Sequence, residues 1–136
     1  MGFFSRTNDA ASVAIERLKA EIQRNPKDAK LVLELAAAYR AKNAVSDAVG
    51  CYLRAANLNQ QAGLSKQAVA LARQALQLAP KQLEPNLFMA DYYEREGLKE
   101  DQRGVLKTLA ELYKTAGRNQ DVEKVLAKIE ALGPGR

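Results

Sequence analysis

Residues 31–63, LVLELAAAYRAKNAVSDAVGCYLRAANLNQQAG, decide the fold of this 136-residue chain. Helix-favouring Ala and Leu dominate the stretch, and its apolar residues recur every three or four positions, as on the buried face of a helix. A related stretch at residues 85–117, PNLFMADYYEREGLKEDQRGVLKTLAELYKTAG, lies 54 positions further along. The chain therefore contains an internal repeat, which is the first feature to seek in a helical sequence.

The repeat extends beyond these two stretches. Pro26, Pro80 and Pro134 are each separated by 54 residues, and pairing residues 27–80 with 81–134 gives twelve identical pairs. The identities fall at expected helix ends and on apolar faces, where packing requires them. They include Leu33/Leu87, Ala36/Ala90, Tyr39/Tyr93, Gly50/Gly104, Leu58/Leu112, Gly63/Gly117 and Leu78/Leu132.

Helical periodicity continues through most of the chain, whereas strand-like alternation is absent. We expect caps at Asn8 or Asp9 and at Ser65, and Pro26 at the first position of the second helix. Connections of two to five residues make successive helices antiparallel neighbours. The expected helices span about residues 9–24, 27–42, 45–62, 65–79, 83–96, 99–116 and 120–132.

These elements predict one all-α domain over residues 1–136, an antiparallel helical-hairpin solenoid of about seven helices. A tail at 1–8 precedes a capping helix at 9–25. Two three-helix units, 27–80 and 81–134, then follow with the 54-residue period. One hairpin cannot bury its apolar face alone, so stacked units share a continuous core.

The motif residues resemble the tetratricopeptide repeat, whose pattern places apolar, small and aromatic residues at fixed spacing along two helices. Here the first copy runs Val32, Leu35-Ala36, Tyr39, Ala48, Tyr52 and Ala55, and the last runs Leu106, Leu109-Ala110, Tyr113, Gly117, Val122, Leu126, Ile129 and Pro134. The copies overlap, because residues 45–62 and 99–116 each serve two copies. The resemblance implies a module that binds another protein or peptide along a concave helical face.

No catalytic constellation is present in the sequence. The chain has no His and only one Cys, Cys51, and it lacks a Gly-rich phosphate loop. We therefore expect no enzymatic activity, no cofactor and no bound metal. Cys51 is expected to be a small buried apolar residue.

Charge and hydropathy limit the partners. The net charge is +5, with basic and acidic residues well mixed, which slightly favours an acidic protein partner and does not suggest nucleic acid. No apolar run is long enough to span a membrane, and no secretory signal is visible. A cytoplasmic location is the resulting expectation.

The expected function is that of a non-catalytic adaptor or scaffold, and Phe88 is the expected binding anchor. Single-stranded RNA binding by a related helical repeat and self-assembly into a structural oligomer are the alternatives. Partner contacts are expected one helical turn from the packing positions. The predicted partner-binding residues are Arg40, Arg54, Asn57, Gln61, Phe88, Asp91, Arg95, Lys107 and Lys114, on faces that also carry Leu33, Ala37, Leu87 and Glu111.

Two further features leave alternatives open. Phe3 and Phe4 either fold back over the first helix, dock on a neighbouring subunit or make a weak contact with a membrane surface. Gly50 and Gly104 lie inside expected helices, where Gly costs about 1 kcal/mol relative to Ala. Either another helix packs closely there, the helix bends, or a partner approaches.

Overall fold

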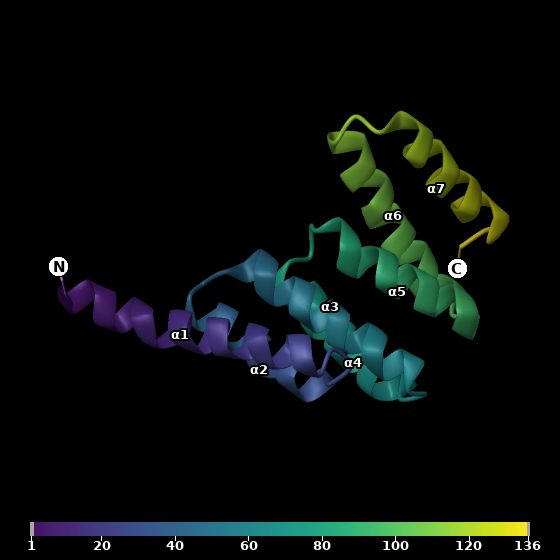
Figure 1. The fold of residues 1–136 in the computed structure, drawn as a ribbon. Coiled ribbons are helices and arrows are strands. Elements are labelled where there is room, and N and C mark those ends of the chain that lie inside the picture. Colours follow the sequence, from purple (N-terminus) through teal and green to yellow (C-terminus); the bar gives the residue numbers. More distant parts are fainter. Residues whose placement is uncertain (1, 136) are drawn as a thin grey trace. The chain divides into compact units, whose positions relative to one another are not determined.

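The computed structural model describes the backbone of residues 2–135 and the side chains of residues 10–135. Within this part of the chain there are seven α-helices and no strand (Figure 1). The prediction of an all-α chain of seven helices is therefore confirmed. The helices are α1 (Gly2–Arg24), α2 (Ala29–Ala41), α3 (Val45–Gln61), α4 (Ser65–Leu78), α5 (Leu83–Glu96), α6 (Lys99–Thr115) and α7 (Asn119–Ala131).

The helices form two compact units, unit 1 over Met1–Ala79 and unit 2 over Pro80–Arg136. In unit 1, α1 packs against α2, α2 against α3, and α3 against α4. In unit 2, α6 packs against both α5 and α7. Within each unit, successive helices run antiparallel (Figure 1), because the connections between them are short.

The helix bounds follow the 54-residue period. Helices α2, α3 and α4 begin at Ala29, Val45 and Ser65, and α5, α6 and α7 begin 54 positions later. The end of α3 is also 54 residues from the end of α6, whereas the other two pairs of ends differ by one residue. The duplicated three-helix pattern is thus present in the structure of the chain.

The turns follow the same period. Asn43 and Gly97 occupy equivalent turns and have φ angles of 60° and 70°. Gly63 and Gly117 are likewise equivalent, with φ angles of 81° and 72°. This left-handed backbone costs little for Gly and is tolerated by Asn, so these residue types end their helices.

Unit 1 has the larger core. The apolar stripe of α1, formed by Ile15, Leu18 and Ile22, is buried against α2. Small residues dominate the rest of the core, and they let the helices approach closely. The other members of this buried cluster are Val32, Leu35, Ala36, Val49, Cys51, Tyr52, Ala55, Ala75 and Ala79.

The core of unit 2 is smaller and centres on α6. Its buried cluster consists of Leu106, Leu109, Ala110, Tyr113 and Val125. Two residues fix the start of α5. Pro85 lies in the first turn, as predicted, where its missing N–H removes no helical hydrogen bond. The Asn86 side-chain amide donates to the carbonyl oxygens of Pro80 at 2.9 Å and Gln82 at 2.7 Å.

Two predicted helix starts are wrong. Helix α1 begins at Gly2, so residues 2–8 are helical backbone rather than a tail. Helix α2 begins at Ala29, because Asp28 Oδ1 accepts from the backbone N–H groups of Lys30 and Leu31. Pro26 therefore lies in the preceding turn.

One predicted cap is also wrong, because Ser65, the predicted cap of α4, is already its first helical residue. Leu64 occupies the capping position instead, without a side-chain cap. The left-handed Gly63 and a hydrogen bond from the Leu64 N–H to the Asn59 carbonyl oxygen set this turn. The side chains of Phe3 and Phe4, for which alternatives were left open, lie outside the described residues.

Candidate interaction grooves

Unit 2 contains a groove over α6, with walls formed by α5 and α7. This groove, called here the unit 2 groove, has a volume of about 290 Å³. It lies over α6, which packs against both neighbouring helices. Its lining residues are Leu87, Ala90, Asp91, Glu94, Gln102, Leu106, Leu109, Tyr113, Asp121, Lys124, Val125 and Lys128.

The floor of the unit 2 groove is apolar. Leu106, Leu109 and Tyr113 project from α6 and Val125 from α7, and each of these residues is buried. Leu87 continues the apolar surface up the α5 wall, where it is 41% exposed. A partner side chain entering the groove would meet hydrocarbon below and water above.

The rim is charged, and most of its charges are paired. Glu94 Oε1 on α5 lies 3.6 Å from Lys128 Nζ on α7, so this ion pair spans the groove. Gln102 Nε2 on α6 donates to the same carboxylate oxygen at 3.4 Å. Asp91 Oδ2 lies 3.2 Å from Arg95 Nε on the same helix. The rim therefore presents little uncompensated charge to a partner.

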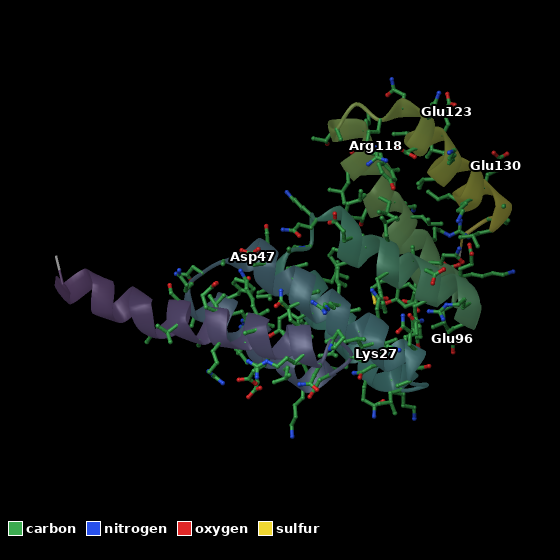
Figure 2. The ribbon with its side chains drawn as sticks, viewed as in Figure 1. Lys27, Asp47, Glu96, Arg118, Glu123 and Glu130 are labelled. Atoms are coloured by element: carbon green, nitrogen blue, oxygen red, sulfur yellow. The ribbon has the colours of Figure 1, made fainter. Side chains whose placement is uncertain are left out.

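The Tyr113 end of the floor is held by a second set of contacts. The Arg118 guanidinium carbon lies 4.8 Å from the centroid of the Tyr113 ring, and Arg118 Nε lies 2.8 Å from Asp121 Oδ2. Figure 2 shows Arg118 where α6 turns into α7, and shows Glu123 and Glu130 on the side of α7 away from α6. Glu123 and Glu130 thus lie outside the groove, whereas Asp121, Lys124, Val125 and Lys128 of α7 line it.

Unit 1 has a groove between α2 and α4, called here the Arg40 groove. It has a volume of about 300 Å³ and is lined by Arg40, Gln74, Gln77 and Leu78. Arg40 Nη1 donates to the Tyr52 hydroxyl at 3.2 Å, which ties the guanidinium to α3.

The four positions that line the Arg40 groove recur in unit 2 after the 54-residue shift. They become Glu94, Lys128, Ala131 and Leu132, which line a groove of about 280 Å³. The two sets of residues occupy equivalent places but differ in charge. The two units therefore share this geometry and differ in its chemistry.

The structure divides the predicted partner-binding residues among several surfaces. Arg40 lines the Arg40 groove and Asp91 lines the unit 2 groove. Arg95 forms an ion pair with Asp91 at the rim and does not belong to the lining of the unit 2 groove. The remaining polar candidates lie on exposed positions of α3 and α6, away from the groove linings, namely Arg54, Asn57, Gln61, Lys107 and Lys114.

Phe88, the predicted anchor, is half-buried and does not belong to the lining of the unit 2 groove. Its neighbour Leu87 does. The α7 wall was not among the predicted contacts, which lie on α2, α3, α5 and α6. The signal was available, because Asp121, Lys124 and Lys128 recur at three- and four-residue spacing beside the apolar Val125.

Gly50 and Gly104 do not mark close helix contacts. Both are exposed, and a Cβ atom built on either would meet no atom within 4 Å. Of the explanations left open, close packing by another helix is therefore wrong for the chain as described.

Cys51 is buried, as expected, and this burial raises the pKa of its thiol. Among the side chains at residues 10–135, no group of three metal-ligating residues is gathered that could hold an ion. No helix in the described part of the chain has the length and apolar character needed to cross a membrane.

No family model matches the sequence, and no curated protein matches it. Among solved structures the chain is similar to two described as crystal structures of MamA and of MamA protein. Both are 14% identical with a TM-score of 0.43, and the match covers 97% of this chain and 94% or 87% of the other chain. Likenesses this loose carry no functional inference to the present chain, which remains a helical repeat defined by its own residues.

Proposed function

We propose that the chain is a tetratricopeptide-like module that binds another protein by receiving apolar side chains of a peptide segment in the unit 2 groove. The observation that carries the proposal is the apolar floor of that groove, bounded by a charged rim. Helical-repeat proteins expose such concave surfaces because each helix contacts only its neighbours in the chain.

The energetics of the groove favour apolar side chains. Leu106, Leu109 and Tyr113 are already held by packing in unit 2. Binding a partner therefore costs little conformational entropy in these three side chains. A volume of about 290 Å³ is near the lower end for ligand pockets, and suits one or two large side chains. Burying one such side chain contributes about 1.5–3 kcal/mol.

The rim favours a protein partner over RNA. Unit 2 holds ten basic and ten acidic residues, while unit 1 holds eleven and six, which together account for the 21 and 16 of the chain. A neutral unit with paired rim charges lacks the basic stripe that would attract a phosphate backbone. Aromatic stacking platforms for bases are also missing from the lining, where Tyr113 is the one aromatic.

The test compares two leucines of unit 2. Leu87 is 41% exposed and lines the groove, whereas Leu126 is 51% exposed and lies outside the lining. The intact chain would be screened against a library of short random-sequence peptides, and the bound peptides measured by fluorescence anisotropy.

We expect the bound peptides to be rich in Leu, Phe or Met. Leu87→Asp should lower the affinity of the protein for these peptides by about tenfold or more. The control Leu126→Asp should leave their affinity unchanged. Equal loss in both variants, or binding of no peptide by the folded protein, would contradict the proposal.

A further inference from the structure

The Arg40 groove is the feature that the proposed function does not use. Its charge is set by one residue, since Arg40 is its only ionisable lining residue and the α4 wall contributes two amides and a leucine. Within the described residues, the guanidinium makes a hydrogen bond to a neutral phenol and no ion pair with a carboxylate. A guanidinium has five N–H donors in a planar fork, which matches the two oxygens of a carboxylate.

The equivalent place in unit 2 shows what satisfies this arrangement. There, Glu94 replaces Arg40 and Lys128 replaces Gln74, and the two side chains form an ion pair at 3.6 Å. The groove equivalent to the Arg40 groove thus has both charges on its own walls, a carboxylate and an ammonium. The Arg40 groove has one charge, that of Arg40, and its α4 wall carries the Gln74 amide in place of the second charge.

We propose that the Arg40 groove binds an acidic side chain of the partner protein, with the carboxylate accepting from Arg40 and from the amides of Gln74 and Gln77. This inference rests on the proposed function and adds to it the chemistry of a second contact. Gln74 and Gln77 are three residues apart on α4 and therefore project from the same side of that helix. Leu78 supplies an apolar surface for the methylene groups of a Glu side chain.

Charge complementarity favours this occupant over the alternatives. All of the net charge of +5 belongs to unit 1, because unit 2 is neutral. An acidic segment would therefore be attracted to the unit that contains the Arg40 groove before it makes contact. The fixed hydrogen bond from Arg40 to Tyr52 holds the guanidinium in place, which reduces the entropy lost on binding.

The experiment uses the intact chain and matched sets of short fluorescent peptides that differ only in carrying Glu, Gln or Lys at one position. Arg40→Gln removes the charge. Lys30→Gln is the control, because it removes the same charge from an exposed position on α2 outside the groove lining. A third variant, Arg40→Glu with Gln74→Lys, builds the ion pair of unit 2 into unit 1.

We expect the wild-type chain to bind Glu peptides about tenfold more tightly than the Gln or Lys peptides. Arg40→Gln and the double variant should lose this preference, and Lys30→Gln should keep it. The double variant tests whether misfolding explains a loss of binding. Its two new side chains should pair with each other as Glu94 and Lys128 do in unit 2, so the variant should fold.

Three results would overturn the inference. The first is a Glu preference that survives in Arg40→Gln. The second is binding of apolar peptides through Leu87 without any Glu preference, which would leave the proposed function intact. The third is single-stranded RNA that competes with the Glu peptides and also loses affinity in Arg40→Gln. Binding of no peptide at all would contradict both the inference and the proposed function.

Discussion

At the scale of the residue, Gly50 and Gly104 are the clearest departures from what helix stability alone would select. Each lies in the middle of a 17-residue helix, is exposed and has open space where a Cβ atom would stand. Neither residue has a positive φ that would require Gly. Their recurrence at the 54-residue shift therefore has no explanation in the packing of either unit.

We expect Gly50→Ala and Gly104→Ala to stabilise the protein by about 0.5–1 kcal/mol each, because Ala reduces the backbone entropy lost on folding. Urea denaturation of the two single variants would measure this. Gly63→Ala is the contrasting control, since Gly63 has a φ angle of 81° and the substitution should destabilise the chain. Destabilisation by Gly50→Ala would contradict the open space around it.

Cys51 provides a second residue-scale test. Burial raises the pKa of its thiol, so less of it is thiolate at mildly alkaline pH than in the unfolded chain. We expect a thiol reagent such as DTNB at pH 8 to label the native protein much more slowly than the urea-unfolded protein. Equal rates would mean that Cys51 is accessible, contrary to its burial.

At the scale of the element, helix ends differ in how they are held. Helix α2 begins with a side-chain cap, in which Asp28 Oδ1 accepts from the Lys30 N–H at 3.0 Å and the Leu31 N–H at 3.3 Å. Helix α4 begins without one. The start of α2 therefore depends on one side chain, whereas the start of α4 depends on turn geometry and packing.

Asp28→Ala should cost about 1 kcal/mol of stability, because it leaves two backbone N–H groups without that acceptor. Asp28→Asn keeps an oxygen acceptor and should cost little. Thermal denaturation of both variants would measure the difference. If both lose the same amount, the contribution comes from the charge at the helix N-terminus and not from the cap.

Helices also differ in how much they bury. Helix α3 contributes six buried residues to unit 1, whereas α7 contributes one, Val125. Local opening requires little free energy where few apolar contacts are lost. We expect the backbone amides of α7 to exchange with deuterium faster than those of α3, as measured by mass spectrometry of peptic fragments. Uniform protection in the two helices would contradict this.

At the scale of the whole molecule, the duplication has produced two units with different surfaces. Unit 1 carries the net charge of +5 and packs mainly through small residues, and unit 2 is neutral and packs through larger ones. Tyr52, Ala55 and Asn59 of α3 correspond to Leu106, Leu109 and Tyr113 of α6. The exchanges of Ala55 for Leu109 and of Asn59 for Tyr113 put larger side chains on α6, along the floor of the unit 2 groove.

The charge difference predicts a salt dependence for the two proposed contacts. Raising the ionic strength shortens the Debye length to about 3 Å at 1 M, so affinity for Glu-containing peptides should fall with added salt. Affinity for neutral apolar peptides should change little, because burial of apolar surface is not screened. Anisotropy titrations at increasing NaCl concentrations would compare the affinities for the two peptide classes. An equal fall in both affinities would contradict the proposal of two separate contacts.

The sequence by itself determined the all-α class, the seven helices and the 54-residue period. These depend on local signals, namely apolar residues at three- and four-residue spacing and the left-handed turns at Asn43, Gly63, Gly97 and Gly117. The identities of packing residues such as Ala36 and Leu109 also followed, because buried positions repeat with the helix period.

The grooves were decided by tertiary structure, and the helix starts by local hydrogen bonds. The cap at Asp28 and the start of α4 depend on which N–H groups meet an acceptor, which spacing alone leaves open. The unit 2 groove joins Leu87 of α5 to Val125 of α7, and the Arg40 groove joins residues more than thirty positions apart. Periodicity shows which side of a helix is apolar, but only the packed helices determine which side chains face each other across a gap, because that depends on how the side chains between them fill space.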